Sequence, residues 1–184
     1  MLKKFFCSNC LNTYEGEVDY NISFQIKDER IKPNYCVEFV CSCECGNTMY
    51  EIDNGIFELI VRLNKLGFYT EYCCEGHWNE GNFTSFPYIK FTCDDEKFRD
   101  SYSHKMENSE EFLLFLEQNL RKELYAEYDT IDTSISINLD TRDMTNDEIN
   151  DLCENETKFE YYKELFLKEI ERIICILEGQ NTKE

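Results

Sequence analysis

Long apolar runs are missing from the chain. No stretch of about 18 apolar residues occurs, which is the length that a transmembrane helix requires. The first residues, which include Lys3 and Lys4, also lack the apolar stretch of roughly 7 to 15 residues found in secretion signals. We therefore expect a protein that acts in the cytoplasm and has no membrane partner.

Alanine and proline are also scarce. Ala126 is the single alanine, and Pro33 and Pro87 are the two prolines, whereas Asn, Ile, Lys, Glu, Tyr and Phe are abundant. This bias is typical of an AT-rich genome, bacterial or phage. No linker-like stretch divides the 184 residues, so we expect one main body with a small appended module.

Basic residues are too few to balance the acidic ones. The chain has 19 lysines and arginines against 38 aspartates and glutamates, and residues 105–184 carry −12 of the formal charge of −19. Affinity for nucleic acid comes mainly from Lys and Arg side chains that neutralise phosphates. The charge balance therefore argues against direct nucleic-acid binding and favours a partner protein with a basic surface, or no partner.

Cysteine, in contrast, is abundant. The chain has 11 cysteines, an odd number that cannot pair completely in disulfides. In a reducing cytoplasm thiols stay free unless a metal ion binds them. Metal binding is the interpretation that we favour.

Four of the cysteines have the spacing of a zinc ribbon. Cys7 and Cys10 form a C-x-x-C turn, and Cys45 lies before a glycine in a second cluster with Cys43 and Cys41. A C-x-x-C turn lets two sulfurs reach one zinc ion, which takes four ligands in a tetrahedron. We choose Cys43 as the fourth ligand, with Cys41 as the alternative, and buried free thiols are the other interpretation. A closed four-thiolate site stabilises the fold and has no open position for a substrate.

The hydrophobic pattern predicts an α+β fold. Alternating or extended apolar patterns predict strands over residues 16–27, 35–41, 48–52, 68–73, 88–93 and 131–139. Helical spacing and capping residues predict helices from Asn54 to Gly67, from Asn108 to about Tyr125, and from Thr145 to Gly179. We therefore expect an N-terminal zinc-ribbon β-hairpin module at residues 1–53. A mixed α/β body with a long C-terminal helix is expected to follow at residues 54–184.

A second cysteine cluster follows one of the predicted strands. Cys73 and Cys74 lie close to His77, one of two histidines, and to the single Trp78. The cluster could bind a second zinc ion through Cys74 and His77. Cys73 or Cys93 would be the third ligand, and a water in the fourth position would leave the ion open for catalysis. Alternatively Cys74 is a nucleophile with His77 as its base, or the segment is a tight turn with buried thiols.

The acidic C-terminal third contains a candidate partner-binding surface. Between residues 140 and 156 there are seven carboxylates against a single arginine. Side chains at helical offsets of three and four share one face. Such a stripe could imitate DNA phosphates for a nuclease or repressor with a basic groove, or it is an ordinary solvated helix face. The candidate contact residues are Asp143, Asp147, Glu148, Asp151 and Glu154.

One short segment resembles known proteins. Residues 63–70, followed by residues 73–77, resemble little-characterised zinc-ribbon proteins encoded by phages and mobile elements of low-GC Gram-positive bacteria. Thr70, Cys74 and Gly76 also match in place the signature T-x-S-S-C-x-G-R of the methyltransferase family that acts late in wybutosine synthesis on tRNA. The two serines and the arginine of that signature are replaced here.

The phage-type resemblance and the acidic charge imply a function. Small acidic phage proteins often bind and disable host proteins. We expect a zinc-binding, non-enzymatic protein that inhibits a host factor in the bacterial cytoplasm, such as a defence nuclease or another nucleic-acid-binding protein, by DNA mimicry. The alternative is a nucleotide- or RNA-interacting enzyme, or a ligand-binding protein, with its site around Cys74 and His77.

Overall fold

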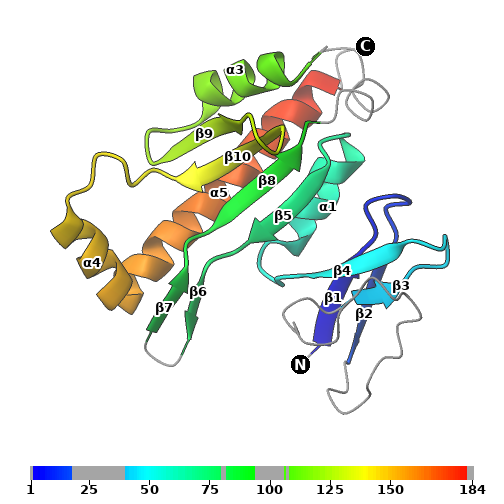
Figure 1. Cartoon of the computed structure of the whole chain (residues 1–184), viewed down its shortest axis with the longest axis horizontal. Helices are drawn as coiled ribbons and strands as arrows, with labels where there is room; N and C mark the ends of the chain where they lie inside the picture. Colours follow the sequence, from blue (N-terminus) through cyan, green and yellow to red (C-terminus); the bar gives the residue numbers. More distant parts are fainter. Residues whose placement is uncertain (1, 18–39, 80–81, 94–105, 107, 182–184) are drawn as a thin grey trace.

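Two four-stranded antiparallel sheets dominate the structure, one at the N-terminus and a larger one that helices cover (Figure 1). The computed structural model describes residues 2–17, 40–79, 82–93, 106 and 108–181. Within these residues there are four helices, the last of them long, so the α+β fold class is confirmed. None of the described helices is long and apolar enough to cross a membrane.

The N-terminal sheet has the strand order β2-β1-β4-β3. Among the described residues, its small core consists of Phe5, Cys7, Cys43 and Met49. Two of these four side chains are thiols, so the burial of hydrocarbon alone contributes little to its stability. The strands are β1 (Leu2–Phe6), β2 (Thr13–Glu17), β3 (Val40–Ser42) and β4 (Thr48–Ile52).

Sequence patterns locate this sheet only in part. The strand predicted over 48–52 is β4, and the one predicted over 35–41 overlaps β3. The strand predicted over 16–27 lies outside the described residues except for its first two positions, which end β2. Alternation does not reveal β1, because residues 2–6 place two adjacent lysines between a leucine and two phenylalanines rather than polar residues at every second position.

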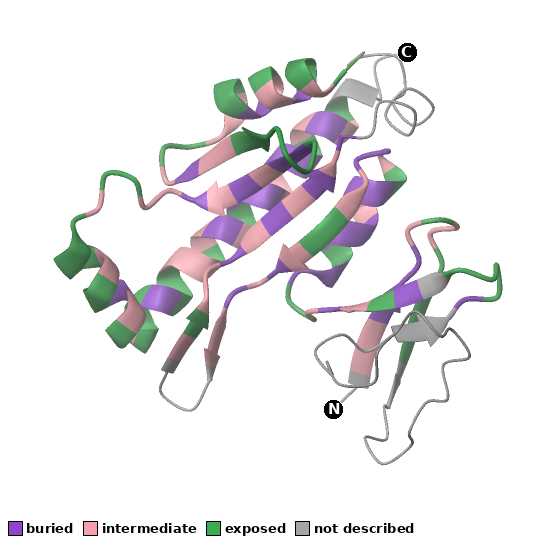
Figure 2. Ribbon diagram, viewed as in Figure 1, coloured by how far each residue is buried: buried purple, intermediate pink, exposed green. Residues whose placement is uncertain are grey.

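The larger sheet has the order β5-β8-β10-β9, and β5 forms one of its edges. Its strands are β5 (Thr70–Cys74), β8 (Tyr88–Thr92), β9 (Leu124–Asp129) and β10 (Ser134–Leu139). Alternation buries one face of the sheet, which includes Ile89, Phe91, Ile135 and Ile137 (Figure 2). Three helices pack against this face in one core: α1 (Phe57–Lys65), α3 (Ser109–Asn119) and α5 (Glu156–Asn181).

A short hairpin extends from the main sheet, in a segment where the sequence pattern predicts no strand. It consists of β6 (His77–Asn79) and β7 (Asn82–Ser85), and α4 (Asn146–Glu154) packs beside it. A third apolar cluster of Leu139, Leu152 and Phe159 fixes this region, with Trp78 and Phe83 packed against it. The hairpin begins at His77, three residues after the end of β5 at Cys74. The second cysteine cluster therefore spans the junction between β5 and the hairpin.

The beginning of α1 differs from the prediction, whereas its end agrees. Asn54 is not the N-cap, because the helix begins at Phe57 and Ile56 occupies the cap position without a side-chain hydrogen bond. Gly67 has a φ of 91° and ends the helix in the left-handed conformation that its position predicts. The N–H of Phe68 then donates to the carbonyl of Leu63 at 2.9 Å.

Two later helices are shorter than predicted. The helix that Asn108 caps ends at Asn119 and not near Tyr125, because Leu124–Asp129 pairs with β10 as strand β9. The helix predicted from Thr145 onward breaks at Asn155, which separates α4 from α5. The side chain of Asn155 accepts from the N–H of Lys158 at 3.2 Å and so caps the start of α5.

Candidate functional site

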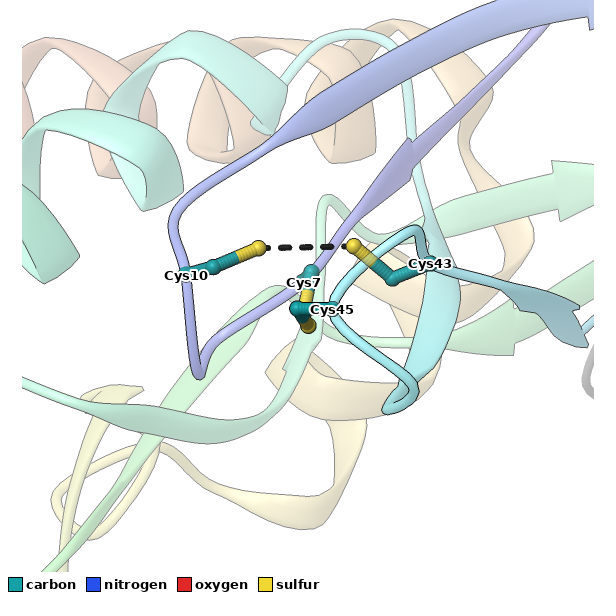
Figure 3. Close-up of side chains that lie close together, drawn as sticks. All are labelled: Cys7, Cys10, Cys43 and Cys45. Atoms are coloured by element: carbon teal, nitrogen blue, oxygen red, sulfur yellow. Dashed lines mark hydrogen bonds between the residues drawn. The ribbon is translucent and has the colours of Figure 1, made fainter.

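Two tight turns bring four cysteines together (Figure 3). Cys7 and Cys10 come from the turn after β1, and Cys43 and Cys45 from the turn after β3. Their sulfurs all lie within 4.8 Å of one another, with Cys7 and Cys45 3.7 Å apart and Cys10 and Cys43 3.3 Å apart. Sulfurs bound to one zinc ion at about 2.3 Å in a tetrahedron lie roughly 3.8 Å apart. The four cysteines could therefore bind a metal ion.

The backbone of each turn explains why the sulfurs converge. Leu11 and Gly46 have positive φ angles of 60° and 85°. The N–H of Leu11 donates to the carbonyl of Cys7 at 2.8 Å, and the N–H of Gly46 to the carbonyl of Cys43 at 2.9 Å. Each closed turn presents its two sulfurs to the other turn. The cluster contains Cys43, whereas Cys41 lies in β3 opposite Met49.

Amide donors surround the most exposed of these thiols. The Nδ2 atom of Asn47 lies 3.4 Å from the sulfur of Cys45, and that hydrogen bond lowers the pKa of Cys45 to about 6. The Nδ2 atom of Asn9 approaches the same sulfur at 4.0 Å. Donors of this kind favour the thiolate, which is the form that binds metal ions.

A cleft of about 580 Å³ lies between the N-terminal sheet and β5. Phe6, Ser8 and residues 50–53 line one side of it, and all five residues of β5, with His77 and Tyr88, line the other. Consecutive side chains of a strand point to opposite faces, so a cleft that touches all five must reach the edge of β5. The described lining residues include Glu51, Asp53 and Glu71 but no lysine or arginine.

Within this cleft the structure brings together Asp53, Cys74 and His77. Their ligand atoms all lie within 4.8 Å of one another, and the His77 Nε2 atom lies 3.0 Å from the Asp53 Oδ2 atom. Cys74 is buried, while Asp53 and His77 are partly exposed. Asp53 follows β4, so it reaches the site from the N-terminal sheet. Sequence spacing does not reveal it, because more than 20 residues separate it from Cys74.

The other predicted members of this cluster lie elsewhere. Cys73 is opposite Ile89 in the β5–β8 pair, so it belongs to the helix-covered face and packs against the main core. Cys74 is opposite Tyr88 on the other face. Cys93 is buried in the main core. The group that could hold a metal ion contains neither Cys73 nor Cys93.

Burial acts against the hypothesis of a free nucleophilic thiolate. Burial is the largest cause that raises the pKa of Cys74, and it raises the pKa of Cys73 to about 12. A reactive cysteine needs a lowered pKa, because the thiolate is the nucleophile. Both shifts therefore favour the protonated thiol when no metal ion is bound.

Glu75 fixes the loop that carries the site. Its carboxylate accepts from the N–H of Gly55 at 2.5 Å and pairs with the ammonium group of Lys163 at 3.0 Å. The N–H of Glu75 itself donates to Asp53 Oδ2 at 3.1 Å. Glu75 thus ties the loop both to the segment before α1 and to α5.

Gly76 allows the turn between β5 and β6, and we expect Gly76→Ala to destabilise the protein by about 2 kcal/mol. Its φ is 84°, and an added Cβ would lie 3.0 Å from Pro87 and 3.1 Å from Phe159. Gly179→Ala is the matched control, because no heavy atom lies within 4 Å of an added Cβ there. It should stabilise α5 by about 0.5 kcal/mol. Urea denaturation measures the free energy of unfolding of both variants. Equal changes in this free energy would contradict the role of Gly76 in the turn.

The acidic candidates in and before α4 are all exposed, but two of them have local partners. Glu148 closes a capping box with Thr145, as its spacing predicts. Asp151 forms an ion pair with Lys158. The remaining exposed candidates are Asp143, Asp147 and Glu154.

Comparison of the chain with protein-family models, with curated proteins and with solved structures finds no match. The resemblance to phage zinc-ribbon proteins and to the tRNA methyltransferase signature therefore stays a prediction.

Proposed function

We propose that this protein inhibits a host factor by binding a basic segment of it in the cleft beside β5. The observation that carries the proposal is the lining of that cleft, which combines carboxylates and tyrosines and has no lysine or arginine among the described residues. In this proposal the chain acts as an anti-defence protein of a phage or mobile element, in the bacterial cytoplasm, and not as an enzyme.

The side chains of the cleft favour lysine or arginine on the partner. Tyr50 and Tyr72 are 49% and 52% exposed, although they are large aromatic side chains. A cation is attracted to the face of such a ring, and Glu71 adds a carboxylate on the exposed side of β5. A nucleotide would find no lysine or arginine for its phosphates among the described lining residues.

The strand edge favours an extended segment. Among the described strands, β5 pairs only with β8, at the end of the main sheet. An edge strand offers unpaired N–H and C=O groups, to which an extended peptide can add as a further strand. Main-chain hydrogen bonds would supply affinity, and the tyrosines and Glu71 would select basic side chains.

The α4 surface offers carboxylates but no strand edge. Two of its five candidate carboxylates have partners within the chain, Glu148 in the capping box and Asp151 in an ion pair. Two of the three cleft carboxylates are also paired, Glu51 with Lys3 and Asp53 with His77, so charge alone does not favour the cleft. We place the principal contact in the cleft because β5 adds an edge strand and exposed tyrosines there.

The ribbon is the scaffold in this proposal. Four thiolates suit zinc, which binds four such ligands in a tetrahedron. A zinc ion bound by Cys7, Cys10, Cys43 and Cys45 would hold the turns that join β1 to β2 and β3 to β4. Because residues 50–52 belong to β4 and Asp53 follows it, the ion would also fix one wall of the cleft.

Selection of peptides from a random display library tests the proposal. The wild type should enrich extended peptides with Lys or Arg at alternate positions, and their affinity should fall between low and moderate salt. The double variant Glu71→Lys and Tyr72→Ala should bind a selected peptide with an affinity at least tenfold lower. Tyr161→Ala, at an exposed tyrosine on α5 outside the cleft, is the matched control and should keep the wild-type affinity. Enrichment of peptides without basic residues, or equal binding by the cleft variant, would refute the proposal.

A further inference from the structure

We infer that Asp53, Cys74 and His77 form a second metal site, which binds a zinc ion through three protein ligands and leaves a fourth position open to the cleft. This inference does not depend on the proposed inhibitory function. It differs from the ribbon, whose four thiolates fill the coordination sphere of one ion.

The positions of the three ligands fit a single ion. Oxygen and nitrogen ligands about 2.0 Å from zinc lie roughly 3.3 Å apart in a tetrahedron. The Asp53 Oδ2 and His77 Nε2 atoms are 3.0 Å apart, and the sulfur of Cys74 lies within 4.8 Å of both ligand atoms. An ion therefore fits among them with small side-chain shifts.

Groups around the ligands already orient them. The N–H of Gly76 lies 3.3 Å from the sulfur of Cys74, and the hydroxyl of Ser85 lies 3.2 Å from it. The N–H of Glu75 donates to Asp53 at 3.1 Å. Outer hydrogen bonds of this kind orient metal ligands and stabilise their charged forms.

The mixture of donors selects zinc. Magnesium and calcium prefer oxygen ligands alone, and copper(I) prefers several soft sulfur ligands. Zinc accepts thiolate, imidazole and carboxylate together. One thiolate and one carboxylate would balance its two positive charges.

The open position follows from the exposure of the ligands. The side chains of His77 and Asp53 are 36% and 27% exposed, whereas Cys74 is buried beneath them. Water can therefore reach the ion from the cleft and occupy the fourth position. Asp53 follows β4 of the N-terminal sheet, whereas Cys74 ends β5 of the main sheet and His77 begins β6 of the hairpin. The ion would therefore also join the N-terminal sheet to the main sheet and the hairpin.

Metal content per chain, measured on protein purified without chelator, tests the site. We expect two zinc ions in the wild type, one fewer in His77→Ala and one fewer in Asp53→Asn. Cys175→Ser, at an exposed cysteine on α5, is the matched control and should leave the content unchanged. An equal zinc content per chain in the wild type and in both ligand variants would overturn the inference.

Cobalt titration of the metal-free wild type keeps the test decisive if a variant fails to fold. The ribbon has four thiolates and the second site has one, so their thiolate-to-cobalt absorption bands should differ about fourfold in intensity. We expect two phases, a strong one and a weak one. A single phase that ends at one cobalt ion per chain would overturn the inference.

Discussion

Removing the metal ion from the ribbon is expected to unfold β1–β4 while the main sheet stays folded. Among the described residues, the N-terminal sheet has a core of its own of only Phe5, Cys7, Cys43 and Met49, although Phe6 and Ile52 pack into the main core. Structural zinc ions bind with apparent free energies of about 10 kcal/mol or more, and this energy is folding energy when no preformed site exists. The main core has its own larger set of buried side chains on α1, α3, α5 and the second sheet.

Hydrogen–deuterium exchange with and without a strong chelator measures this effect. Amides of β1–β4 should lose protection when the metal is removed, and amides of β8 and β10 should keep it. Cys10→Ser should reproduce the effect of the chelator, and Cys175→Ser should not. If β1–β4 stay protected after complete removal of metal, the ribbon does not depend on an ion.

Replacing Glu169 by alanine is expected to destabilise the protein by about 3 kcal/mol. Glu169 is 2% exposed, although it carries a charge. Its carboxylate accepts from the N–H of Arg121 at 3.0 Å and from the Nε atom of Arg172 at 3.0 Å. Arg172 in turn donates to the carbonyl of Asn119, so this network joins α5 to the end of α3.

Glu164→Ala is the matched control for Glu169→Ala. Glu164 lies on the same helix and pairs with Lys168 at 3.1 Å, but both side chains are about two-thirds exposed or more. Such exposed pairs contribute about 0 to 1 kcal/mol. Urea denaturation at neutral pH should separate the two variants by about 2 kcal/mol or more. Equal stabilities would show that the buried network contributes nothing.

The effect of Glu169 should also depend on pH. Burial opposes the charged carboxylate, but Arg172 and the N–H of Arg121 outweigh burial, so the pKa of Glu169 is lowered. The folded state then favours the charged form above the unfolded pKa of about 4.3. Wild type and Glu169→Ala should therefore differ most at neutral pH. Their difference should shrink as the pH falls through the folded pKa, and a constant difference would contradict this origin.

Local signals in the sequence predict several features correctly. Asn108 caps α3 by accepting from the N–H of Glu111, and Thr145 and Glu148 form the capping box of α4. Gly67 ends α1 in the left-handed conformation. Each of these interactions joins residues only a few positions apart, so residue type and spacing are sufficient to reveal it.

Where local signals compete with burial, the tertiary structure decides. Helical spacing extends the predicted helix to Tyr125, but the chain turns into a strand because Leu124 pairs with Leu139 and enters the core. The final helix breaks at Asn155, where the side chain caps a new helix that crosses the main sheet. Propensity is a weak preference, and burial of apolar side chains exceeds it.

The sequence by itself determined the four-cysteine cluster and the α+β class. Short turns close each pair of thiols, and their spacing is visible in the chain. Only the tertiary structure decided the second site. It placed Cys73 against the main core and Cys74 on the opposite face of β5, and it brought Asp53 from the N-terminal sheet to His77. Such contacts depend on how two sheets pack, and that packing is the joint result of many distant side chains rather than of any local pattern.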